Sequence, residues 1–275
     1  MVKIINLFLI IVLSFNLFGC KKKQDLFSFT PDEIKQKINI FLEIEKEKSY
    51  KKIENIYKIH FQNIVLKMDE KYQLETNLKI EKANRNCVLN QEVHLNKIVL
   101  SKAMQKIFYL WMKESLSNYR QVSNKKKRGE YLKFAQNFYE GFQSQVKEIG
   151  LYSENENLFD VKILESFSSL KKYIDSQDQW KEELEIKKID DISKEIFGLS
   201  VCYKIKQLEE IRKKNINIAQ TKLTEAVLYY DIIVEEIIKN NPYGYKTICK
   251  SFTGDLFKID AKIIEKEIFL GLKIL

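Results

Sequence analysis

Apolar residues recur every three or four positions along most of this chain, which is the spacing of one face of a helix. The clearest stripes cover residues 34–42, 53–68, 90–111, 131–150, 158–174, 192–211 and 219–237. Shorter apolar segments cover residues 180–184, 245–252 and 256–268. No stretch alternates apolar and polar residues long enough to indicate a sheet. The pattern therefore predicts an all-α protein.

Start and stop signals separate these stripes. Thr30-Pro31-Asp32-Glu33 combines a capping residue, a proline at the first helical position and a capping-box glutamate. A second capping box covers residues 153–156, the polar residues 123–129 predict a break, and Asn240-Asn241-Pro242 predicts a stop. The connections are short, so consecutive helices are expected to pack as antiparallel neighbours.

Composition supports one helical domain. Glycine (8 of 275 residues) and proline (2 of 275) are scarce, and 45% of the residues are hydrophobic, which excludes disorder and argues against a turn-rich β fold. No linker rich in proline, glycine or serine divides the chain. We expect a single-domain multi-helix bundle over residues 30–275.

The first 20 residues form a targeting segment. Lys3 precedes residues 4–18, of which 12 of 15 are apolar, too few to span a membrane but typical of a signal peptide. Leu17-Phe18-Gly19-Cys20, followed by three lysines, resembles a bacterial lipobox, although Phe18 departs from its strict form. We expect a cleaved signal peptide (1–19) and a lipidated tether (20–29) acylated at Cys20. An ordinary signal peptide and an uncleaved anchor are the alternatives.

The sequence motifs of the common enzyme sites are missing from the chain. The two histidines, His60 and His94, are 34 residues apart and form no zinc motif. No two glycines lie within six residues of each other, so a glycine-rich phosphate loop and a nucleophile elbow are excluded. We predict neither metal nor cofactor and no catalytic activity. An unrecognised carboxylate site is the weakest alternative.

Three cysteines remain after the lipobox cysteine: Cys87, Cys202 and Cys249. They show no C-x-x-C spacing, and at most one disulfide can form among them. We expect buried free thiols, with Cys249 beside Ile248 acting as a small buried hydrophobe, and leave one intramolecular disulfide open. The aromatic stripe Tyr131, Phe134, Phe138 and Phe142 is expected to be a core face rather than a ligand site.

The charge distribution contains one dense basic run. The chain holds 47 lysines and arginines against 38 acidic residues, a formal net charge of +9. Lys125, Lys126, Lys127 and Arg128 follow Asn124 in a predicted loop, and we expect all four to project into solvent. Such runs are weak motifs for heparin-like polyanions, the alternative being a solvated loop. Nucleic acid is disfavoured because an exported protein would rarely meet it.

The relaxed lipobox, the bias to Lys, Ile, Asn, Phe and Tyr, and the helical body together resemble the Borrelia-type spirochaetal surface lipoproteins, although no paralogous family can be assigned. The resemblance implies a non-enzymatic protein on the outer membrane, held by acyl chains on Cys20. Some such proteins bind host complement regulators, plasminogen or extracellular matrix. We therefore expect a surface module that binds a host protein or polyanion. A periplasm-facing lipoprotein with a structural or envelope-assembly role is the alternative, and the oligomeric state stays open.

Overall fold

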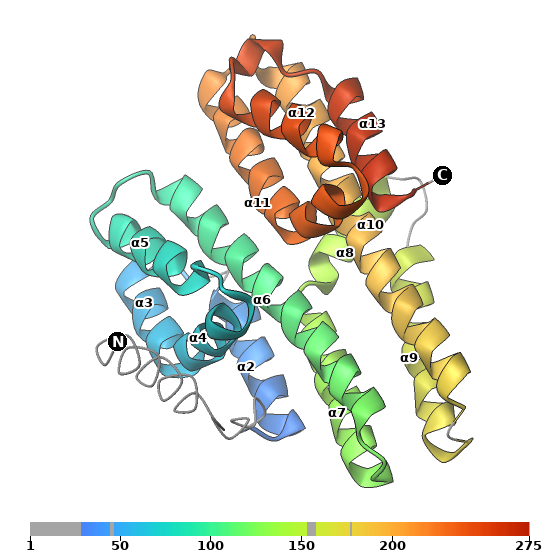
Figure 1. Ribbon diagram of the computed structural model, residues 1–275. Helices are drawn as coiled ribbons and strands as arrows, with labels where there is room; N and C mark the ends of the chain where they lie inside the picture. The colour runs from blue at the N-terminus through green and yellow to red at the C-terminus, as the bar shows by residue number, and fades with distance from the viewer. Residues whose placement is uncertain (1–28, 45–46, 153–157, 177, 275) are drawn as a thin grey trace, which may run out of the picture. The chain divides into compact units, whose positions relative to one another are not determined.

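The computed structural model describes residues 29–44, 47–152, 158–176 and 178–274. Residues 31–275 form one compact unit, whose described residues contain twelve α-helices, one 3₁₀ helix and no strand (Figure 1). The elements are α2 (Pro31–Ile44), α3 (Tyr50–His60), α4 (Gln62–Tyr72), α5 (Thr76–Val88), α6 (Val93–Gln121), α7 (Lys125–Glu140), α8 (Gln143–Tyr152), α9 (Leu158–Ser176), α10 (Gln179–Ile211), α11 (Ile216–Asn240), α12 (Pro242–Thr253), η1 (Leu256–Lys258) and α13 (Ala261–Leu272). The all-α prediction is confirmed. The predicted signal peptide, most of the tether and the capping box at 153–156 lie outside the described residues.

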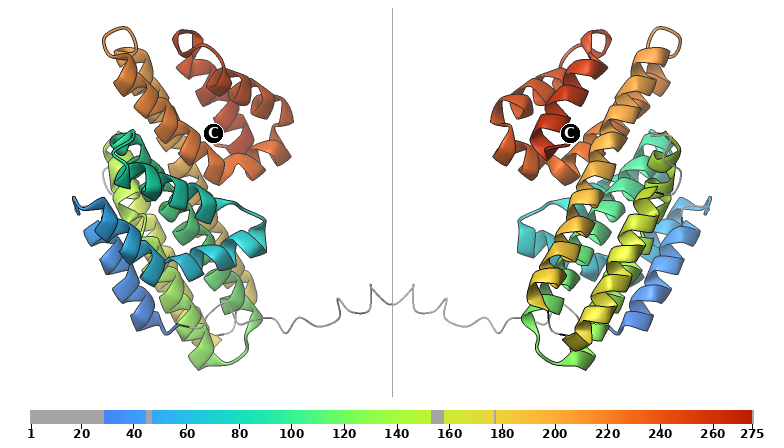
Figure 2. Two further views of the ribbon diagram at one scale, coloured as in Figure 1. Left: turned by 90° about the vertical axis from the view of Figure 1, so that its left-hand side faces the viewer. Right: turned by 90° about the vertical axis from the view of Figure 1, so that its right-hand side faces the viewer.

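Two long helices organise the unit. Helix α6 packs against α4, α5, α7 and α11, and α10 packs against α8, α9, α11 and α13. Figure 2 shows α10 running beside α9 and on to the end of the unit where α11, α12 and α13 gather. Helix α6 buries Ile107, Phe108, Tyr109 and Met112 on different sides, because neighbours surround it.

Aromatic rings on α6 and α7 form the centre of the core. The ring of Phe108 lies 5.0 Å from that of Phe41 and 6.3 Å from that of Phe138. On the other side of α6, Phe142 contacts Tyr109 and Phe197 at ring-centre distances of 6.3 and 5.7 Å. Phe134, Phe138 and Phe142 are buried and Tyr131 is partly buried, so the predicted core face is confirmed.

Side-chain caps explain where several helices begin. Asn124 accepts a hydrogen bond from the Lys127 backbone N–H at the start of α7, and Asp178 accepts one from Lys181 at the start of α10. Asn241 caps α12, in which Pro242 occupies the first turn. The predicted stop at residues 240–242 is therefore confirmed.

Three predicted element boundaries are wrong, and one helix was not predicted. The stripe over 53–68 is split at Phe61, whose backbone leaves helical geometry (φ −121°, ψ −29°) while its ring packs into the core. The stripe over 131–150 is split at Gly141 and Phe142 between α7 and α8. Residues 180–184 and 192–211 belong to the single helix α10, and α5 was not predicted at all.

Gly141 permits the close approach of α6 and α7. A Cβ atom at Gly141 would collide with Cδ2 of Phe108, whose side chain is fully buried, whereas a Cβ at Gly129 would meet nothing within 4 Å. We expect Gly141→Ala to lower the free energy of unfolding by about 1–3 kcal/mol through overpacking. Gly129→Ala should raise it by about 0.5–1 kcal/mol, because alanine is the better helix former. Urea denaturation of both variants measures the difference; equal effects would contradict this packing.

Candidate functional site

The predicted basic run divides into two parts in the structure. The residues begin helix α7 instead of lying in a loop, because Asn124 caps the helix at Lys127. Lys125, Lys126 and Lys127 are exposed, as expected, but Arg128 is buried with 5% of its surface accessible. The expectation that all four cations project into solvent is therefore wrong for Arg128.

Arg128 belongs to the core between α6, α7 and α10. Its guanidinium forms an ion pair with Glu182 and lies 4.4 Å from the centre of the Tyr119 ring. The Tyr119 hydroxyl donates to the Leu170 carbonyl oxygen at 3.0 Å. Burial, followed by the charge of Glu182, raises the pKa of Tyr119 to about 12. This group of side chains holds helices together and offers no polyanion access to Arg128.

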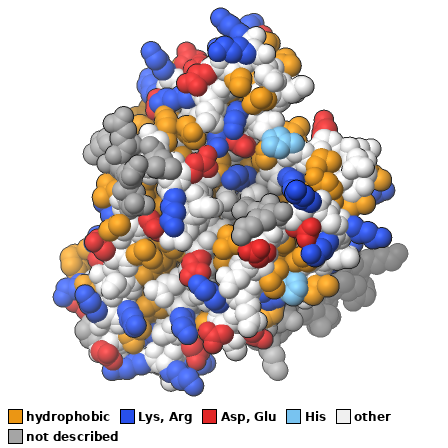
Figure 3. Space-filling view, turned by 180° about the vertical axis from the view of Figure 1, so that it is seen from behind, with side chains coloured by type: hydrophobic (Ala, Val, Ile, Leu, Met, Phe, Trp, Pro, Cys, Tyr) orange, Lys and Arg blue, Asp and Glu red, His pale blue; other side chains and the backbone are white. Residues whose placement is uncertain are grey.

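The remaining lysines of the run lie at the end of the unit where α6 meets α7 and α9 meets α10. Lys125 Nζ lies 3.0 Å from Asp175 Oδ1 at the end of α9, whereas Lys126 and Lys127 form no ion pair within the described residues. On the face seen in Figure 3, lysines and arginines are interspersed with acidic side chains. That face therefore carries no broad basic field.

The three cations in the first turn of α7 do not stabilise the helix. The amino end of a helix carries partial positive charge, so each nearby cation costs about 0.3–1 kcal/mol. Helix α7 has no acidic residue in its first turn to compensate. Helix stability therefore does not explain why Lys125, Lys126 and Lys127 occupy these positions.

Three partly buried carboxylates, those of Asp190, Glu148 and Glu225, are engaged in ion pairs. Burial alone would raise the pKa of Asp190, but Lys113, Lys194 and a 2.8 Å hydrogen bond from the Tyr109 hydroxyl hold it below its usual value. Lys204 is buried between Glu148 and Glu225, at 2.6 and 3.1 Å. These carboxylates are charged partners of structural lysines.

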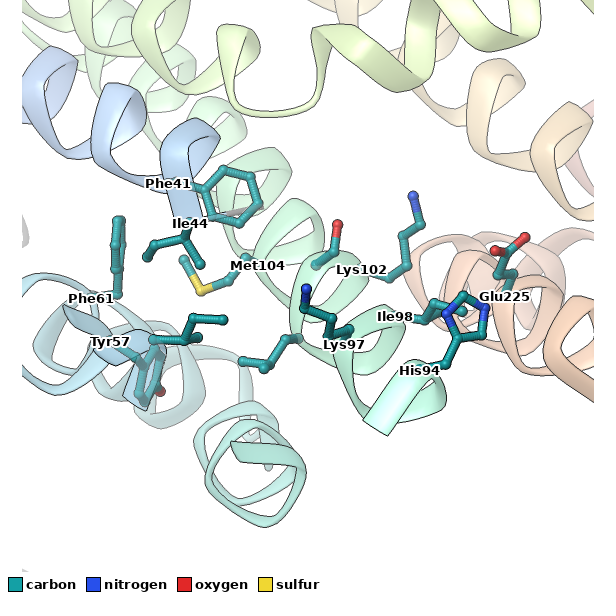
Figure 4. Close-up of a pocket in the computed structure, with 13 residues that line it drawn as sticks. Phe41, Ile44, Tyr57, Phe61, His94, Lys97, Ile98, Lys102, Met104 and Glu225 are labelled. Carbon is teal, nitrogen blue, oxygen red and sulfur yellow. The ribbon is translucent and has the colours of Figure 1, made fainter. Parts of the chain in front are cut away.

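An apolar cavity of about 300 Å³ opens between α2, α3 and α6 (Figure 4). Its apolar end gathers Phe41, Ile44, Phe61 and Met104, and Lys97, Lys102, His94 and Glu225 lie toward the other end. We call it the amphipathic cavity; its lining residues are Phe41, Ile44, Ile53, Tyr57, Phe61, His94, Lys97, Ile98, Leu100, Ser101, Lys102, Met104 and Glu225. Sequence reasoning missed it because its lining comes from four separate elements.

A buried polar network fixes the cationic end of this cavity. Gln145 Oε1 accepts hydrogen bonds from the Tyr229 hydroxyl and, at 3.4 Å, from Lys102 Nζ. Gln145 Nε2 donates to Ser200 Oγ at 2.9 Å. The Lys102 ammonium also lies 4.8 Å from the centre of the Tyr229 ring. Side chains from α8, α10 and α11 thus hold the Lys102 ammonium beside the cavity.

All three described cysteines are free, which settles the disulfide question left open by the sequence. Cys87 and Cys202 are buried, and burial raises the pKa of the Cys202 thiol to about 12, so neither is a reactive thiolate. Cys249 is only partly buried, contrary to expectation, because Ile248 takes the buried position. His60 is half-buried, and burial followed by Lys37 lowers its pKa.

The described residues contain no group of three or more His, Cys, Asp or Glu side chains suited to a metal ion. None of the described helices has the length and apolarity needed to cross a bilayer. Cys20 lies outside the described residues, so its acylation stays a prediction. Comparisons with protein-family models, curated proteins and solved structures found no match.

Proposed function

We propose that this chain is a lipoprotein, anchored through acyl chains on Cys20, whose helical body binds a host protein or polyanion outside the membrane. The lipobox-like sequence at residues 17–20 supports the anchor. The observation that carries the binding role is the exposed lysine cluster Lys125, Lys126 and Lys127 at the start of α7. Arg128 is left out of this site because it is buried.

The cluster suits a polyanion better than a single small anion. Three adjacent flexible cations at the end of a rigid helix present several contacts without a cavity to enclose a ligand. Two of them, Lys126 and Lys127, have no acidic partner within the described residues to be displaced. Binding of this kind is electrostatic, so it must weaken as the Debye length falls from about 10 Å at 0.1 M salt to about 3 Å at 1 M.

Heparin retention tests the proposal. Replacing Lys125, Lys126 and Lys127 together by serine should weaken heparin affinity at 0.1 M salt by about a hundredfold, since each of the three cations contributes on the order of 1 kcal/mol at a polyanionic surface. The protein of residues 24–275 is suitable because it contains the whole compact unit 31–275. Circular dichroism should show unchanged helicity, because these side chains are exposed.

A matched variant separates the local cluster from net charge. Lys258, Lys262 and Lys266 are also exposed and lie on η1 and α13, so their replacement by serine removes the same charge elsewhere. This variant should keep the parent's heparin affinity. If both triple variants lose affinity equally, or neither does, the lysine cluster is not the binding site.

A further inference from the structure

We propose that the amphipathic cavity binds a single-chain fatty-acid carboxylate, with the hydrocarbon chain between α2, α3 and α6 and the carboxylate at Lys97. This inference is independent of the anchor and of the lysine cluster on α7. It rests on the lining of the cavity, its volume and the charges beside its polar end.

The apolar end is built on the rigid core. Phe41 packs edge-on against Phe61 and Phe108, at ring-centre distances of 6.3 and 5.0 Å. The Tyr57 hydroxyl donates to Asn77 Oδ1 at 2.8 Å, so its polar atom is satisfied by α5 and its ring is available to line the cavity. The hydrocarbon-binding surface is therefore pre-formed, as in most small-molecule sites.

The charges at the polar end of the amphipathic cavity favour an anion. Lys97 Nζ lies 3.3 Å from the Glu47 carbonyl oxygen and 5.4 Å from the centre of the Tyr50 ring, both neutral groups. Glu225 is the one carboxylate among the lining residues, and its Oε2 already lies 3.1 Å from Lys204 Nζ and 3.4 Å from Lys222 Nζ. Its negative charge is thus compensated, and the polar end has a net attraction for anions.

The volume selects one chain. About 300 Å³ is at the lower limit of ligand pockets, which span about 300–1,000 Å³. A phospholipid with two acyl chains does not fit such a space. A neutral hydrocarbon would fill the apolar end but would provide no anion to pair with the Lys97 ammonium. A monocarboxylate with one alkyl chain matches both ends.

Isothermal titration with a chain-length series tests the proposal. Residues 24–275 are titrated with octanoate, decanoate and dodecanoate below micelle formation. Affinity should rise about fourfold for each methylene that enters the cavity and level off when it is full. Decanol, which has the same chain length as decanoate and no charge, should bind about tenfold more weakly. No chain-length dependence, or equal affinity for decanol and decanoate, would overturn the proposal.

Two pairs of variants locate the binding. Leu100→Trp fills the cavity and should abolish decanoate binding, whereas Leu110→Trp, on the same helix but away from the cavity, should not. Lys97→Met should weaken binding about tenfold and reduce its salt dependence, whereas Lys213→Met, an exposed lysine after α10, should leave it unchanged. Thermal melts confirm folding. Full decanoate affinity in folded Leu100→Trp would contradict this site.

Discussion

Replacement of Arg128 by alanine is expected to lower the free energy of unfolding by about 3–5 kcal/mol, although the sequence places this residue in a run of surface lysines. Its side chain is 6% exposed and that of its partner Glu182 is 3% exposed. Removing the cation leaves the Glu182 carboxylate buried without its counter-charge. It also removes the guanidinium from the ring of Tyr119. Chemical denaturation monitored by circular dichroism measures the loss.

Two variants serve as controls for Arg128→Ala. Lys127→Ala, one residue earlier and exposed, should change stability by no more than about 0.5 kcal/mol. The double variant Arg128→Met, Glu182→Leu should recover most of the loss, because a buried ion pair replaced by apolar groups of similar size is often neutral. Equal stability of Arg128→Ala and Lys127→Ala would show that Arg128 is not buried.

Phe142→Ala is expected to cost about 3–5 kcal/mol, as for other large aromatic residues truncated in a core. Its side chain is fully buried between α7 and α8, and its ring contacts those of Tyr109, Tyr139 and Phe197. The cavity left by alanine cannot close easily, because each of the three neighbouring rings is itself packed within the same aromatic core. Thermal and urea unfolding should both report the loss.

Phe257 provides the matched control for this substitution. It lies on η1 and is 48% exposed, so Phe257→Ala should cost less than about 1 kcal/mol. A small effect of Phe142→Ala, comparable to that of Phe257→Ala, would mean that the aromatic stripe does not form the core.

The sequence predicted the helices whose buried faces are apolar. The stripe of Phe134, Phe138 and Phe142 could be read directly because large aromatic residues recur at helical spacing and face the core. Asn240, Asn241 and Pro242 likewise predicted the end of a helix, and α11 ends at Asn240. In these segments, the local pattern and the tertiary packing favour the same structure.

Helix α10 was divided in the prediction because part of its buried face is polar. Glu182, Glu185 and Ser193 are buried there, while Trp180, at the start of the predicted apolar segment 180–184, is 71% exposed. Ser193 satisfies its hydroxyl within the helix by donating to the Ile189 carbonyl oxygen at 2.7 Å. Glu182 depends on Arg128, a partner 54 positions away that spacing along one helix cannot reveal.

Helix α5 was missed because its buried face is made of small or polar residues. Ile80, Ala83, Asn84 and Cys87 occupy positions i, i+3, i+4 and i+7, but only one of them is a large hydrophobe. The amphipathic cavity was missed for a different reason, since α2, α3, α6 and α11 each supply part of its lining. Both features depend on the assembled unit rather than on one segment.

The proposed anchor is tested most directly by mass spectrometry of the full-length protein purified from bacterial membranes. We expect the mature chain to begin at Cys20, with acyl chains on that residue and residues 1–19 removed. A Cys20→Ala variant should lose its partition into the membrane fraction, because acyl chains that bury many methylenes provide stable attachment. An unmodified Cys20, or a Cys20→Ala protein that still partitions with membranes, would contradict the lipoprotein account.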